Sequence, residues 1–134
     1  MTRRRNPETA IHCTVVQHLN ARGMPGVMWW HTPNGGYRNK SEAMLLKAMG
    51  VKAGVPDFLL FSAGRLHGLE IKAQGGRASP EQLAFIAELD RAGAYTALVT
   101  GLDACLATLE SWGLLKPNLT MRDIARNVEL ARQP

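Results

Sequence analysis

The feature that most constrains the fold is a pair of short apolar segments joined by a tight turn in the middle of the chain. Residues 55–61 are apolar apart from Asp57 and a proline, and residues 66–73 form the second segment. The intervening residues 62–65, Ser-Ala-Gly-Arg, favour a turn, so the pattern predicts an antiparallel β-hairpin. The chain is therefore expected to contain a β-sheet, with Asp57 interrupting one of its apolar strands.

Helical and extended segments alternate around this hairpin. Helices, with their N-terminal capping residues where one is present, are expected over residues 6–21, 41–49, 79–93, 102–112 and 120–132. Runs at residues 27–30 and 95–100 predict two further strands. The order predicts an α/β fold with a mixed central sheet flanked by helices, in which helix 79–93 joins two parallel strands.

The 134 residues suit one domain. We expect a flexible basic N-terminus at residues 1–5, a folded domain at 6–116 and a C-terminal helical extension at 117–134. No apolar run is long enough to span a bilayer and no signal-peptide pattern is present, so we expect a cytoplasmic protein without a membrane partner. Cys13 and Cys105 stand apart from other metal-ligand residue types and are expected to be small buried residues.

The hairpin brings three charged residues into mainly apolar strands. Alternate side chains of a strand share a face, so Glu70 and Lys72 should project together, opposite to Leu69 and Ile71. If Asp57 lies across from them, the clustered charges are costly unless they bind something. Mg²⁺ prefers carboxylate oxygens and promotes phosphodiester hydrolysis. A solvated cross-strand ion pair is the alternative interpretation.

Two polar residues near helix starts add to this cluster. Glu8 falls within about 40° of the apolar side of the first helix, which directs a carboxylate toward the sheet. A favourable interaction with the helix dipole would also explain an acidic residue there. Gln82 lies on the apolar side of helix 79–93, but with Ser79 it also matches a capping box. Both the functional and the capping interpretations remain open.

In combination these residues resemble the VRR-NUC family, a branch of the PD-(D/E)xK nuclease superfamily. The likeness spans roughly residues 6 to 115. It rests, in chain order, on Glu8, on residues 50–57 (GVKAGVPD), on Glu70-Ile71-Lys72 and on Ser79-Pro80-Glu81-Gln82.

The resemblance implies a restriction-endonuclease-like core and a metal-dependent DNA endonuclease. The implied ligands of Mg²⁺, or of Mn²⁺ in its place, are Glu8, Asp57, Glu70 and the backbone carbonyl of Ile71. The implied catalytic residues are Asp57, Glu70, Lys72 and Gln82. Small stand-alone members are similar to homodimeric enzymes that cut Holliday junctions, which implies a homodimer acting on branched DNA. A catalytically inactive DNA-binding module and a basic adaptor with the same fold are the alternatives.

The basic residues are unevenly distributed. The first 56 residues hold eight Lys and Arg against two acidic residues, within a net charge of +5 for the chain. This asymmetry suggests a surface that faces a polyanion. The candidates for contacts with DNA phosphates are Arg38, Lys40, Lys52 and Arg77. Lys47 is at least as well explained as a solvated residue, and the arginines at 3–5 as a solubilising tail.

Three further residues have more than one interpretation. His31 follows the first predicted strand and would approach the metal, contact the DNA or stabilise the turn. Trp29 and Trp30 are adjacent in that strand, so one ring should face the core and the other should face outward.

Overall fold

The computed structural model describes residues 6–33, 38–117 and 128–133. Its elements are α1 (Pro7–Arg22), β1 (Met28–His31), α2 (Lys40–Ala48), β2 (Phe58–Ser62), β3 (Arg65–Lys72), α3 (Pro80–Arg91), β4 (Tyr95–Thr100) and α4 (Leu102–Ser111). Among the described residues, no helix is long and apolar enough to cross a membrane. Residues 128–131 are helical, while the predicted cap at Thr120 and the basic N-terminus lie outside the described ranges.

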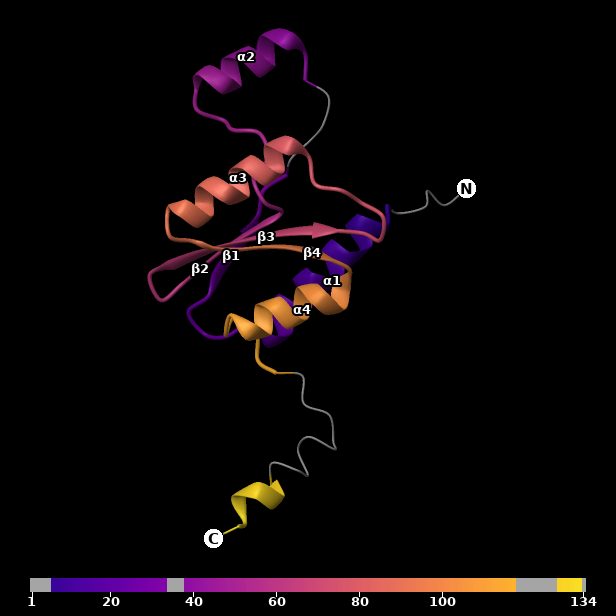
Figure 1. The fold of residues 1–134 in the computed structure, drawn as a ribbon, viewed down its shortest axis with the longest axis vertical. Coiled ribbons are helices and arrows are strands. Elements are labelled where there is room, and N and C mark those ends of the chain that lie inside the picture. Colours follow the sequence, from indigo (N-terminus) through magenta and orange to yellow (C-terminus); the bar gives the residue numbers. More distant parts are fainter. Residues whose placement is uncertain (1–5, 34–37, 118–127, 134) are drawn as a thin grey trace.

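The four strands form one mixed sheet in the order β1-β2-β3-β4. The pairs β1–β2 and β2–β3 are antiparallel, and β3–β4 is parallel. Figure 1 shows α3 on one side of the sheet, α1 and α4 on the other, and α2 apart from the sheet at one end of the molecule. The predicted α/β class, the hairpin and the parallel pair joined by a helix are confirmed.

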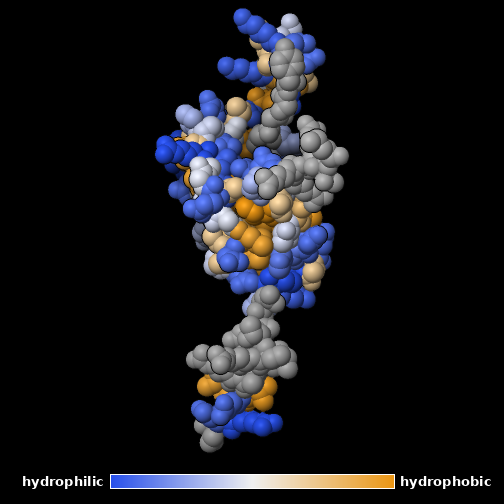
Figure 2. All heavy atoms as spheres, turned by 90° about the vertical axis from the view of Figure 1, so that its right-hand side faces the viewer, coloured by the Kyte–Doolittle hydropathy of each residue, from blue (hydrophilic) through white to orange (hydrophobic). Residues whose placement is uncertain are grey.

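The main hydrophobic core lies between the sheet and the helices α1 and α4. Phe58 and Leu60 of β2 and Leu69 and Ile71 of β3 are fully buried there. Burying each such side chain contributes about 1.5–3 kcal/mol, and this burial fixes the faces of the strands. Glu70 and Lys72 therefore take the opposite face of β3, as predicted. Figure 2 shows that hydrophobic side chains also gather on part of the outer surface of the body.

Asp57 lies just before β2. Its apolar surroundings had predicted that it lies within the strand, and this prediction was wrong. The hairpin register pairs Phe58 with Leu69, which would place Asp57 opposite Glu70. The Asp57 N–H instead donates to the Glu70 side chain at 3.1 Å. β2 begins only at Phe58, and the N–H of the residue before it is bound by a side chain.

Two other sequence predictions were wrong. The second helix begins at Lys40 because Asn39, not Ser41, is its N-cap and accepts the Glu42 N–H at 2.8 Å. Cys13 is exposed, whereas Cys105 is buried as expected. The helical period explains the exposed cysteine: Cys13 is about 200° around α1 from Val15, which is buried.

Gly54 sets the approach of the chain to Asp57. Its φ is +84°, and a Cβ atom there would lie 2.3 Å from the Glu81 carbonyl oxygen and 2.7 Å from the Gln82 nitrogen. The loop therefore lies against the first turn of α3 as closely as a glycine permits. This contact fixes Asp57 relative to Gln82.

We predict that Gly54→Ala destabilises the protein much more than Gly26→Ala. Gly26 has the same φ of +84°, but a Cβ atom there would meet nothing within 4 Å, so its substitution tests the backbone strain alone. That strain costs about 1–2 kcal/mol. The steric clash at Gly54 should add about 1–3 kcal/mol. Chemical denaturation measures both values, and equal losses would contradict the close contact with α3.

Candidate active site

Two carboxylates at the end of the hairpin hold each other through backbone hydrogen bonds. Glu70 Oε2 accepts the Asp57 N–H at 3.1 Å, and Asp57 Oδ2 accepts the Ile71 N–H at 2.8 Å. Each side chain thus binds the backbone of the segment that carries the other. The arrangement fixes both carboxylates at the same end of the sheet.

Glu70 is 1% exposed and is the most deeply buried acid of this group. Burial, and then the charge of Asp57, raise the pKa of Glu70 to about 7, while hydrogen bonding and the charge of Lys72 oppose that rise. The carboxyl group therefore changes its protonation near neutral pH. A cation beside it would favour the ionised form.

Lys72 places its amine among acidic side chains. Its Nζ lies 3.1 Å from Glu70 Oε1 and 3.8 Å from Glu8 Oε1. The lysine side chain is 11% exposed and that of Glu8 is 35% exposed, so Glu8 is the more accessible partner of the lysine. Glu8 of α1 faces the sheet end, as its helical position predicted.

The donor set fits a hard divalent cation. Glu8, Asp57 and Glu70 each offer a carboxylate oxygen, and these atoms all lie within 4.8 Å of one another. Mg²⁺ and Mn²⁺ take oxygen ligands in this arrangement, together with water and substrate phosphate. The Ile71 N–H contacts Asp57. The role predicted for its carbonyl remains a prediction.

Gln82 completes the predicted cap and also contacts the carboxylate cluster, while its predicted role in the reaction stays a prediction. Its Oε1 accepts the Ser79 N–H at 2.8 Å, and Ser79 Oγ accepts the Gln82 N–H at 3.1 Å, which completes a capping box. The amide nitrogen of the same side chain donates to Glu70 Oε1 at 2.8 Å. The start of α3 is thereby tied to the carboxylate cluster.

Two histidines lie next to Asp57. His31 ends β1, and His12 lies one helical turn beyond Glu8 on α1. His12, His31 and Asp57 offer ligand atoms within 4.8 Å of one another. Burial and the neighbouring His31 lower the pKa of His12, against an opposing effect of Asp57. Sequence reasoning assigned His12 no role, although the i, i+4 spacing from Glu8 was a signal that the two share a helix face.

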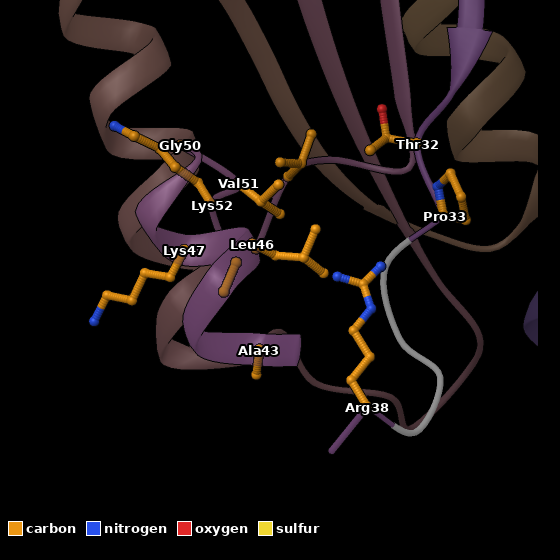
Figure 3. A pocket seen from close by; sticks show the side chains of 12 residues that line it. Thr32, Pro33, Arg38, Ala43, Leu46, Lys47, Gly50, Val51 and Lys52 are labelled. Atoms are coloured by element: carbon orange, nitrogen blue, oxygen red, sulfur yellow. The ribbon is translucent and has the colours of Figure 1, made fainter. Parts of the chain in front are cut away.

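The predicted DNA-binding residues do not form one group. Arg38 and Lys52 line a cavity of about 940 Å³ between α2, the residues after β1 and the loop that leads to Asp57. Figure 3 shows Arg38 reaching toward the space beside Leu46, whereas the Lys47 side chain points away. Lys40 begins α2, and Arg77 is exposed in the β3–α3 connection. The cavity adjoins the acidic cluster through Thr32, whose N–H donates to the Asp57 carbonyl at 3.1 Å.

The two tryptophans of β1 divide as predicted. Trp29 packs against the hydrophobic core, and Trp30 is 38% exposed.

The raised pKa of Glu70 predicts a specific pH dependence of stability in metal-free protein. Because this group has an ordinary pKa of 4.5 and a pKa of about 7 in the folded protein, the folded state holds the proton more tightly. Its stabilising contribution is complete below pH 4.5 and is lost as the pH rises through 7. Relative to Glu70→Gln, the free energy of unfolding of the native protein should fall by on the order of 3 kcal/mol across this pH range. Chemical denaturation of both proteins in EDTA measures their unfolding free energies at each pH. Parallel profiles of unfolding free energy against pH for the two proteins would contradict the prediction.

Comparison with known proteins agrees with this geometry. The VRR-NUC domain family matches residues 6–103, which is well over half of the chain. A solved structure described as a VRR_NUC domain protein is similar at 23% identity and a TM-score of 0.65, over 81% of this chain and 89% of that one. A second, described as a VRR_NUC domain, has 17% identity and a TM-score of 0.55, over 80% of this chain and 97% of that one. The search of curated proteins gave no match. The chain belongs to the VRR-NUC family of nucleases.

Proposed function

We propose that this protein is a Mg²⁺-dependent DNA endonuclease, with Mn²⁺ able to replace Mg²⁺. The observation that carries the proposal is the pair Asp57 and Glu70, which the reciprocal hydrogen bonds fix beside the amine of Lys72. A bound divalent ion supplies an acidified water and offsets the charge that develops on a phosphate. Asp57, Glu70 and Glu8 would hold that ion.

The other side chains position the reacting groups. Lys72 is mostly buried and adjoins Glu70, so its positive charge is held at the site even without substrate. From there the amine can orient the attacking water or stabilise negative charge on the phosphate. Gln82 is a positioning residue, because its amide fixes one oxygen of Glu70.

DNA binding is proposed to use the basic residues around the approach to Asp57. Arg38 and Lys52 line the cavity beside α2, and Lys40 and Arg77 lie on exposed segments on either side of the hairpin in the sequence. Arginine and lysine contacts to phosphates hold DNA without reading its sequence. This mode suits an enzyme that recognises the shape of its substrate.

We further propose that the enzyme is a homodimer that cuts branched DNA such as Holliday junctions. Support comes from α2, which has no buried residue and stands apart from the sheet (Figure 1). Met44 and Leu45 of α2 and its C-cap residue Met49 are 65%, 62% and 72% exposed, and a second copy of the chain would cover this apolar surface. Two-fold symmetry would present two active sites to two strands.

Asp57→Asn and Lys72→Met should each lower the rate of DNA cleavage at least about 100-fold, because each removes a charge at the reacting phosphate. Lys116→Met is the matched control, since Lys116 is exposed and follows Leu115, which pairs with Gly23 at the end of α1 opposite to Glu8. The assay uses labelled linear duplex, flap, splayed-arm and four-way-junction DNA with Mg²⁺, Mn²⁺ or EDTA.

Cleavage that survives Asp57→Asn or Lys72→Met would contradict the site assignment. Faster cutting of the four-way junction, with paired symmetric nicks and a dimer in sedimentation, would support the proposed substrate and assembly. Binding of all four DNAs by folded, Mg²⁺-loaded protein that cuts none would favour an inactive DNA-binding module.

The phosphate contacts predict a change in the salt dependence of DNA affinity. Arg38→Gln and Lys52→Gln should each reduce the slope of log K against log salt by about 0.9, the value for one lost phosphate contact on duplex DNA. Arg91→Gln at the far end of α3 is the control and should leave the slope unchanged. Fluorescence anisotropy in EDTA measures binding without cleavage. Unchanged slopes for Arg38→Gln and Lys52→Gln would show that these residues do not contact phosphates.

A further inference from the structure

We propose that His12, His31 and Asp57 form a second metal site, beside the carboxylate site, which binds a divalent transition-metal ion such as Mn²⁺, Co²⁺ or Zn²⁺. The three residues come from α1, the end of β1 and the residue before β2. Their ligand atoms all lie within 4.8 Å of one another. One ion can therefore contact all three after small side-chain adjustments, because such ions bind nitrogen and oxygen at about 2.0–2.2 Å.

Among the described residues, the His31 ring makes one hydrogen bond, which leaves its other ring nitrogen available for a metal. Its Nδ1 lies 2.7 Å from the Asp57 carbonyl oxygen. A carbonyl oxygen only accepts hydrogen bonds, so Nδ1 carries the proton and the lone pair of the neutral ring is on Nε2. Metal-binding histidines commonly have this arrangement, in which a backbone carbonyl fixes the tautomer and the ring orientation.

His12 is held by ring contacts on two sides. It stacks on Phe58 with ring centroids 4.3 Å apart and an interplanar angle of 21°, and it meets His31 edge-on at 4.1 Å and 74°. Phe58 is fully buried, so the surface against which His12 rests is rigid. The two imidazoles are therefore already gathered before an ion binds.

Asp57 belongs to both groups of potential ligands. It lies with His12 and His31 on one side and with Glu8 and Glu70 on the other. Its Oδ2 accepts the Ile71 N–H, and its second carboxylate oxygen allows it to bridge two ions. Two-metal sites that act on phosphodiesters hold their ions about 3.5–4 Å apart, a spacing that a bridging carboxylate can span.

The two sites should differ in the ions that they prefer. Three carboxylates suit Mg²⁺, whereas two imidazoles and one carboxylate suit Mn²⁺, Co²⁺ and Zn²⁺. Excess Mg²⁺ should consequently displace Co²⁺ from the carboxylate site and leave it at the histidines. The second site shares Asp57 with the proposed nuclease site, and only in this respect does it rest on the proposed function. Metal binding at the histidines can be measured without DNA.

The test is titration of full-length protein with Co²⁺ in excess Mg²⁺, followed by calorimetry and by the visible absorption of the cobalt ion. Native protein should bind one Co²⁺ under these conditions. His31→Ala and His12→Ala should each weaken this binding at least about tenfold. His18→Ala is the matched control, since His18 also lies on α1 but contacts Arg22 instead, and it should bind Co²⁺ as the native protein does. Should His12→Ala fail to fold, as judged by circular dichroism, His12→Asn and the substitution of the exposed His31 by alanine provide the same test.

Equal Co²⁺ affinity in native protein and folded His31→Ala would overturn the second site, and so would complete displacement of Co²⁺ by Mg²⁺. These results are separable from the nuclease proposal. Histidine-dependent Co²⁺ binding by a protein that cuts no DNA would support the second site alone. Mg²⁺-dependent cleavage without histidine-dependent Co²⁺ binding would support the nuclease alone. In either case Glu70→Gln should retain Co²⁺ at the histidines, and its loss there would contradict two separate sites.

Discussion

The reciprocal hydrogen bonds between Asp57 and the Glu70-Ile71 segment are the interaction on which the rest of the site depends. Glu70 is almost completely removed from water, and burying a carboxylate without partners would be very costly. Backbone, amide and ammonium donors around it offset that cost. The same contacts lie at the start of β2, hold the Asp57 side chain against β3 and link the hairpin to the start of α3. The proposed catalytic cluster and a structural junction are therefore made by the same atoms.

Much of the fold could be predicted because it follows from local periodicity. The alternation along β3 put Glu70 and Lys72 on one face, and the apolar runs on either side of the turn specified the hairpin. Features that depend on contacts between distant segments were predicted less well. Asp57 was expected inside a strand because its neighbours are apolar, but a side chain 13 residues away competes for its N–H. Asn39 and Ser41 are both good N-caps, and the sequence alone does not choose between them.

The candidate site shows the same division between local and long-range information. Glu8 and Gln82 each had a structural and a functional interpretation. For Gln82 the structure confirms the cap, made by its amide oxygen, and adds a contact of its nitrogen with Glu70 that the sequence did not predict. His12 received no role because nothing in the sequence brings α1, the end of β1 and Asp57 together. Its ring contacts with Phe58 and His31 arise only in the folded sheet. Residues that recur at helical or strand spacing were therefore easier to place than residues gathered from three elements.

The central claim is that Asp57 and Glu70 are arranged to share a divalent ion. Its most direct test is a crystal structure with Mn²⁺, in which anomalous scattering locates the ions independently of any assumed role. We expect an ion at roughly 2.0–2.3 Å from carboxylate oxygens of both Asp57 and Glu70, with Glu8 nearby or joined through water. Absence of an ion between Asp57 and Glu70 in fully Mn²⁺-loaded, folded protein, with their hydrogen bonds intact, would contradict the account.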